Sequence, residues 1–235
     1  MLVKANAVEL LQRELARKRV VGTIGLGSMN DPYMPLEAQV NLTGRALQVI
    51  ARFGFPVHVI TKSDLVLKDL DALCEIKRVY AAVSFTVTAA DDDLAKKVEP
   101  GTPSVSARFR AMQVLAEHGI HTGLTMMPVL PFIEDNEENV RQIVEQAHAH
   151  GAAYILPSFG VTLRDRQRAY YYDRLDEQFA GLRQKYERAY GERYDCPVPH
   201  AEGLAKVFHD LCSQYGIATR MTPYRPGAAK QLSLF

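Results

Sequence analysis

Residues 53–64, FGFPVHVITKSD, contain the end of one predicted helix, a predicted strand and the start of the next helix. Gly54 follows a helical pattern over residues 36–53, a place where a left-handed residue commonly closes a helix. The apolar run 57–61 is typical of a strand, and Ser63 or Asp64 is placed to cap the next helix. Gly119 and Gly151 likewise each stand after a helical pattern and before an apolar run. The sequence therefore predicts an α/β fold whose parallel strands are joined by right-handed crossovers.

The same alternation extends over most of the chain. Strands are expected at 20–27, 57–61, 79–88, 121–127 and 153–156, and helices at 3–19, 36–53, 65–73, 105–118 and 137–150. Residues 164–194, rich in Arg, Tyr and Gln, are expected to form helices outside the sheet, followed by a last helix at 201–215. Because the chain opens with a helix, the first strand of a barrel that begins with a strand is unaccounted for, and we expect a segment upstream to be missing.

Composition restricts the class of protein. With 235 residues and 47% apolar composition the chain is expected to form one globular domain, residues 1–222, followed by a flexible tail, residues 223–235. Lys and Arg number 28 against 27 for Asp and Glu, so any nucleic-acid contact must be local. No apolar run approaches the roughly 20 residues of a membrane span, and no secretory signal is evident, which predicts a cytoplasmic protein without membrane contact. Three scattered cysteines, Cys74, Cys196 and Cys212, lack metal-ligand spacing, and Cys74 and Cys212 are expected to pack among apolar neighbours.

Polar residues stand where the first two strands end, which is where parallel α/β folds carry their chemistry. The loop 28–37 follows the first strand, and its Asp31 is a candidate for binding a ligand amine, although Asp31-Pro32 is also typical of a plain turn with Tyr33 covering the rim. Gly22, Gly25 and Gly27 would let a ligand approach the backbone. Lys62, after the second strand, is a candidate partner for a carboxylate.

The third and fourth strands add further candidates. Alternation within 83–88 predicts that the hydroxyls of Ser84, Thr86 and Thr88 line the lumen, either to bind a ribose or amino acid or simply to fill space. Glu99 offers a carboxylate for sugar hydroxyls, and Arg108 is either a guanidinium for a ligand carboxylate or a solvated helix residue. The apolar loop within 126–135 suits a flat ring such as adenine, and its end, Asp135 with Glu138, is typical of a capping box.

Taken in order, four motifs resemble the radical S-adenosylmethionine superfamily, and most closely its spore photoproduct lyase-like branch: 27–37 (GSMNDPYMPLE), 61–63 (TKS), Glu99-Pro100 with Arg108, and Pro128-x-x-Pro131. The resemblance spans about residues 3–165. It implies a partial (β/α) barrel that binds S-adenosylmethionine and a 4Fe–4S cluster, whose reduction yields a 5′-deoxyadenosyl radical. It places the cofactor residues as follows: Ser28, Asn30, Asp31 and Tyr33 near the methionine amino group; Lys62, Ser84, Thr86, Glu99 and Arg108 near ribose or carboxylate; and Val129 and Pro131 near adenine.

The sequence departs from this family in its cysteines. Such enzymes hold the cluster through Cys-x-x-x-Cys-x-x-Cys after the first strand, and no three cysteines of this chain have that spacing. Because thiolates hold the cluster and set its potential, we expect this chain alone to assemble no cluster and to perform no radical chemistry. The sequence looks N-terminally truncated relative to the family, and its catalytic residues are not identifiable.

A second resemblance lies at the C-terminus. Residues 231–235, QLSLF, are similar to the peptide by which bacterial replication and repair proteins dock on the DNA polymerase sliding clamp, which implies partner-binding roles for Gln231, Leu232, Leu234 and Phe235. The alternative is a tail of accidental composition. DNA is a second expected partner, because tyrosines 170–172 with arginines 164, 166 and 168 suit base stacking and phosphate contact, although the same residues suit a helix surface and core.

Three functions remain open from the sequence. The leading interpretation is a radical S-adenosylmethionine protein related to DNA repair lyases that retains the cofactor-binding part. The second is a different (β/α) barrel, an aldolase-like enzyme that uses Lys62 as its nucleophile. The third is a non-catalytic protein that binds the sliding clamp or associates with DNA.

Overall fold

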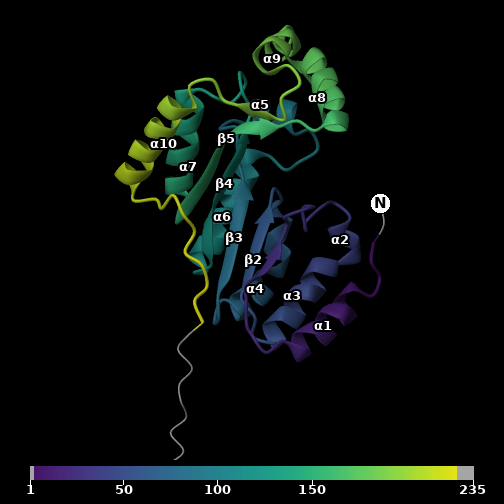
Figure 1. Cartoon of the computed structure of the whole chain (residues 1–235). Coiled ribbons are helices and arrows are strands. Elements are labelled where there is room, and N and C mark those ends of the chain that lie inside the picture. Colours follow the sequence, from purple (N-terminus) through teal and green to yellow (C-terminus); the bar gives the residue numbers. More distant parts are fainter. Residues whose placement is uncertain (1–2, 227–235) are drawn as a thin grey trace, which may run out of the picture.

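The computed structural model describes residues 3–226, and within that range it contains a six-stranded sheet in the order β1-β2-β3-β4-β5-β6. The strands are β1 (Ile24–Leu26), β2 (Val57–Thr61), β3 (Ala81–Thr86), β4 (His121–Val129), β5 (Tyr154–Thr162) and β6 (Asp195–Pro197). β1 to β5 run parallel, and β6 pairs with β5 in the antiparallel sense. The sheet curls with helices against its outer face (Figure 1), so the prediction of a partial (β/α) barrel is confirmed.

Helices connect the successive parallel strands, as predicted from the glycines that end the helical patterns. Those between β1 and β5 are α2 (Glu37–Val40), α3 (Leu42–Arg52), the 3₁₀ helix η1 (Asp64–Asp69), α4 (Leu70–Ile76), α5 (Asp92–Val98), α6 (Val105–Glu117) and α7 (Glu137–Ala149). Helix α1 (Ala7–Arg17) precedes β1, α8 (Asp165–Gln178) and α9 (Leu182–Tyr190) lie between β5 and β6, and α10 (Ala201–Tyr215) follows β6. Gly54, Gly119 and Gly151 have positive φ angles of 66°, 71° and 79°, which confirms their role as left-handed caps.

The two faces of the sheet differ in polarity because side chains alternate along each strand. In β2, Val57, Val59 and Thr61 are buried under the helices, whereas His58 and Ile60 on the concave face are partly open. In β3, Val83 and Phe85 belong to the main core, and Ser84 and Thr86 face the concave side. The predicted division of the 83–88 segment into an apolar and a hydroxyl face is therefore confirmed.

Local structure departs from the prediction in several places. The strand expected at 20–27 is reduced to Ile24–Leu26, and the helix expected at 65–73 is divided into η1 and α4. The helix expected over 36–53 is broken into α2 and α3 at Asn41, whose φ of 49° is left-handed. Helix α5 was not predicted, and its N-terminus is capped by the Asp91 carboxylate, which accepts from the backbone amides of Asp93 and Leu94. Strand β6 was also not predicted, because its three residues carry no periodic signal of their own.

Helices α8 and α9 form a hairpin with a core of its own, at the upper right of Figure 1. Tyr172, Tyr186 and Tyr190 are buried there, and the Tyr186 hydroxyl donates to the carbonyl of Pro131 at 2.7 Å. Arg168 is buried with them and donates to the carbonyls of Gly191 and Arg193. Of the aromatic and basic residues expected to contact DNA, Tyr172 and Arg168 are therefore core residues, while Tyr170 is 65% exposed.

After α10 the chain returns to the amino ends of the strands. Ala218 pairs with Tyr154 at the start of β5, and the carbonyl of Thr222 accepts a hydrogen bond from the Tyr80 hydroxyl just before β3. The tail residues Gln231, Leu232, Leu234 and Phe235 lie outside the described residues, so clamp binding stays a prediction. No helix within residues 3–226 is both long and apolar enough to span a bilayer.

Candidate functional site at the carboxyl ends of the strands

An ion cluster joins three of the predicted site residues at the carboxyl ends of β2 and β3. The Glu99 carboxylate lies 2.6 Å from Lys62 Nζ and 2.5 Å from an Nη atom of Arg108. The Lys62 side chain is 39% exposed, that of Glu99 10%, and that of Arg108 fully buried. The three charged groups therefore differ in burial: the guanidinium is buried, the carboxylate is nearly buried, and the ammonium is accessible to solvent.

Arg108 is the internal anchor of this cluster. Besides Glu99, its guanidinium donates to the carbonyl of Thr86, the carbonyl of Pro103 and the hydroxyl of Thr102. These contacts engage all five N–H groups, since the Pro103 carbonyl accepts from both Nε and Nη2. The alternative of a solvated Arg108 is therefore wrong, and the residue acts on the site by holding Glu99 in place.

Asp31 fixes the loop after β1 to the end of β2. Its carboxylate accepts from the backbone amide of Tyr33 at 2.8 Å, from the Thr61 hydroxyl at 2.6 Å and from the amide of Lys62 at 2.7 Å. A carboxylate that accepts three such bonds is oriented by the protein. Asp31 and Lys62, separated in the sequence, are thus brought together as the strand order requires.

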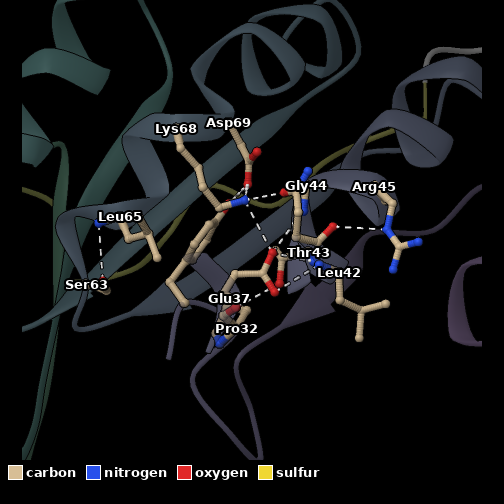
Figure 2. A network of polar contacts seen from close by, with 12 residues as sticks. Pro32, Glu37, Leu42, Thr43, Gly44, Arg45, Ser63, Leu65, Lys68 and Asp69 are labelled. Carbon is tan, nitrogen blue, oxygen red and sulfur yellow. Dashed lines mark hydrogen bonds and ion pairs between the residues drawn. The ribbon is translucent and has the colours of Figure 1, made fainter. Parts of the chain in front are cut away.

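Two further residues of the 27–37 motif, Tyr33 and Glu37, link this loop to α3 and η1 (Figure 2). We call this set of contacts the clasp. The Glu37 carboxylate, drawn near Leu42, Thr43 and Gly44, accepts from their backbone amides at 3.1, 2.8 and 3.4 Å, and Lys68 Nζ lies 3.3 Å away. A carboxylate at a helix N-terminus satisfies free amides and complements the helix dipole. Glu37 therefore serves to hold the backbone of the loop.

Tyr33 belongs to the same clasp. Its ring is buried with 1% of its surface exposed, and its hydroxyl donates to Asp69 at 3.0 Å. Burial and the Asp69 carboxylate raise the pKa of the Tyr33 hydroxyl well above its ordinary value. Tyr33 is thus a packed residue under the loop, at the wall of the cavity beside Lys62. Ser28 and Asn30 are exposed on the same loop.

A cavity of about 410 Å³ opens beside the ion cluster. Residues from the ends of β1 and β2 and from the segment after Glu99 line it, among them Asp31, Tyr33, Lys62, Ser63, Gly101 and Thr102. Its size falls in the range of small-molecule sites. Ser63 also caps η1, because its hydroxyl accepts from the Leu65 amide, as the sequence predicts.

Ser84 lies deeper in the lumen than the rim cluster. It is fully buried, and its hydroxyl is 2.8 Å from His58 Nε2 and 2.7 Å from the Tyr154 hydroxyl. Burial and the neighbouring His121 lower the pKa of His58, and burial lowers that of His121, so the lumen favours neutral imidazoles. Ser84 is therefore engaged within the protein rather than presented at the rim. One step nearer the rim, the hydroxyls of Thr86 and Thr125 are 2.8 Å apart.

The loop after β4 contains a buried acid that the sequence analysis missed. Glu134 has no exposed surface, accepts from the Thr88 hydroxyl and the Leu130 amide at 2.8 Å each, and has its pKa raised to about 7, chiefly by burial. The apolar residues before it were the available signal. The expected capping box of Asp135 with Glu138 is wrong, because Asn136 caps α7 through the Asn139 amide.

Of the residues expected near adenine, both Val129 and Pro131 are buried. The Val129 side chain belongs to the main core and is not available to a ligand. The Pro131 carbonyl is held by Tyr186, as described above. The α8–α9 hairpin thereby supports the loop that follows β4.

The donor set does not fit an iron–sulfur cluster. Within residues 3–226, no three His, Cys, Asp or Glu side chains converge in a way that would hold a metal ion. Cys196 and Cys212 are buried in different cores, and Cys74 lies on α4. Burial also raises the pKa of the thiols of Cys196 and Cys212, which disfavours the thiolate form that binds iron.

Comparison with known proteins gives consistent matches. The family model described as the radical SAM superfamily matches residues 2–147. An uncharacterized protein of Mycobacterium tuberculosis is 28% identical over 229 residues, which is 96% of this chain and 66% of that protein. The chain thus spans just under two thirds of the length of this relative.

Solved structures share the fold. A cysteine-to-serine mutant of spore photoproduct lyase superposes with a TM-score of 0.68 at 15% identity, over 92% of this chain and 66% of that one. A second mutant of the same lyase, with bound AdoMet and dinucleoside spore photoproduct, gives 0.67 at 14% identity over the same shares. At these identities the likeness concerns the fold.

Proposed function

Since the chain belongs to the radical SAM superfamily, we propose that it forms the S-adenosylmethionine-binding half-barrel of a radical SAM protein, with the cofactor in the cavity beside Lys62. The observation that supports this proposal is the continuous chain of contacts from Asp31 through Lys62 to Glu99 at the edge of that cavity. Parallel α/β sheets bind their ligands at this edge.

The chain's residues suit the parts of this cofactor in different ways. Lys62 is the cation that solvent can reach, so we assign it to the methionine carboxylate. Glu99 is positioned by Arg108 and is suited to accept from ribose hydroxyls. We assign the adenine ring to the backbone of residues 129–131, where the side chains of Val129 and Pro131 are buried.

Isothermal titration of the chain with S-adenosylmethionine tests this assignment. We expect binding by the unmodified chain and a loss of roughly 10- to 100-fold in affinity for Lys62→Ala, because hydrogen bonds to charged groups contribute about 1.5–3 kcal/mol. Lys206→Ala, an exposed lysine on α10, is the matched control. Equal affinities of the two variants, or no binding by the unmodified chain, would overturn the proposal.

We also propose that this chain alone assembles no 4Fe–4S cluster, since its cysteines lie in separate packing environments. Anaerobic reconstitution with iron and sulfide, followed by gel filtration and iron analysis, tests this. About four irons retained per chain would contradict it. The reaction of a whole protein of this type, including a lyase reaction on DNA, is a proposal for which likeness of fold is the support.

The aldolase-like alternative is disfavoured by the ion pair between Lys62 and Glu99. A Schiff base requires an amine that is free to attack a carbonyl, and Lys62 Nζ is instead engaged by the Glu99 carboxylate at 2.6 Å. Borohydride trapping with a carbonyl substrate separates the two functions. A covalent adduct on Lys62 would support the aldolase-like function.

A further inference from the structure

A second cavity, of about 580 Å³, lies on the hairpin side of the rim. It is bounded by α5, by α8 and by the loop after β4, elements that meet at the upper right of Figure 1. The volume is suited to a ligand of nucleotide size. Of the residues assigned to the cofactor, only Leu130 of the 129–131 segment lines this cavity, which we call the α5–α8 groove.

Positive charge converges on the groove from both helices. Lys96 and Lys97 on α5 and Arg174 on α8 line it, opposed by the single carboxylate of Asp93. Among the carboxylates whose side chains the structure describes, which exclude Asp165, none lies within ion-pair distance of either lysine. Arg174 pairs with the half-exposed Glu177. For a chain whose net charge is +1, this is a local concentration of cations suited to an anionic ligand.

An aromatic ring and an apolar floor accompany these cations. Tyr170 is 65% exposed, and the Arg174 guanidinium carbon lies 5.4 Å from its ring centroid. Leu130, Ile133 and Phe179 also line the groove. An exposed ring beside cations and apolar side chains is the combination by which proteins stack bases while they contact the phosphate backbone.

The groove adjoins the cofactor cavity through a common wall. Val98 and Pro100 line the groove, whereas Gly101 and Thr102, the next residues along the chain, line the cavity beside Lys62. Glu99, which lies between Val98 and Pro100 in the sequence, belongs to the ion cluster. A ligand in the groove would therefore lie on the other side of one short segment from the cofactor cavity.

We propose that the α5–α8 groove binds single-stranded nucleic acid, with a base against Tyr170 and phosphates at Lys96, Lys97 and Arg174. An acidic peptide would use the cations but would gain little from the flat ring. The proposal goes beyond cofactor binding and does not depend on it, because the groove and the cavity have different lining residues.

Fluorescence anisotropy with a labelled single-stranded oligothymidylate of about 12 nucleotides tests the proposal on the full chain. We expect Tyr170→Ala to weaken binding by roughly 5- to 150-fold, and Tyr170→Phe, which keeps the ring, to bind like the unmodified chain. The double variant Lys96→Ala/Lys97→Ala should lower affinity and reduce the dependence of log affinity on log salt by about 1.4.

Each outcome is decisive when S-adenosylmethionine titration is run in parallel. Unchanged cofactor affinity in the groove variants, together with weakened oligonucleotide binding, would support two separate sites. Failure of the unmodified chain to bind the oligonucleotide would overturn the groove proposal and leave the cofactor proposal standing. Equal binding by Tyr170→Ala and Tyr170→Phe, with displacement by an oligoglutamate peptide, would also overturn it in favour of an acidic-peptide site.

Discussion

Replacing Glu99 by Gln tests how the ion cluster is held. The substitution keeps the shape of the side chain and removes the charge that faces the fully buried Arg108 guanidinium. Breaking a buried pair from one side costs about 3–5 kcal/mol, because the remaining charge is uncompensated. Arg108 keeps its bonds to Thr86, Thr102 and Pro103, so we expect the lower end, about 3 kcal/mol. For a chain of 235 residues this corresponds to a fall in melting temperature of about 6–12 °C.

Circular dichroism and urea unfolding measure this change. Glu75→Gln is the matched control, since Glu75 pairs with Arg78 at the surface, where the two side chains are 50% and 75% exposed, and should cost less than about 1 kcal/mol. Lys62→Met should fall between them because the Lys62 side chain is 39% exposed. If Glu99→Gln unfolded at the same temperature as Glu75→Gln, the idea that Glu99 compensates a buried charge would be refuted.

Three further predictions concern the buried acid, the clasp and the tail. The raised pKa of Glu134, about 7 against the ordinary 4.5, means that the folded state binds its proton more tightly, so its stabilising effect is complete below about pH 4.5 and is lost as pH rises through 7. Urea unfolding of Glu134→Gln should therefore show a relative gain of about 3 kcal/mol between pH 4.5 and 8, and a difference independent of pH would contradict this. Gly44→Ala should destabilise the protein by about 1–3 kcal/mol, because the new methyl would lie 2.5 Å from the Asp69 carboxylate. The control Gly203→Ala, in open space on α10, should stabilise the protein slightly. Equal melting temperatures of the two variants would argue against the clasp. Deletion of residues 231–235 should abolish binding to a bacterial sliding clamp in surface plasmon resonance, and unchanged affinity would remove the docking proposal.

Sequence patterns predicted the elements that obey simple periodicities. Strand β2 and helix α10 have the predicted bounds, because a short apolar run that follows Gly54 and a long amphipathic repeat are local signals. The break at Asn41 was missed because it depends on Glu37 reaching three amides of the following helix. That contact is satisfied only once the chain has turned back on itself.

The sequence predicted which residues lie at the candidate site, but it did not predict what each of them contacts. Parallel topology correctly brought Asp31, Lys62 and Glu99 to one edge. Whether a polar residue meets a ligand or other parts of the protein depends on burial, which the sequence does not show for a residue such as Arg108. Glu134 was missed for the same reason, since an acid after an apolar loop is normally a solvated helix start.

The course of residues 217–226 affects how this protein meets two molecules at once. The segment leaves α10 and reaches the amino ends of the strands, where Tyr224 packs against Tyr80. The ion cluster and the α5–α8 groove stand at the other extremity of the sheet. A macromolecule bound to residues 217–226 would consequently leave both the ion cluster and the α5–α8 groove open to other ligands.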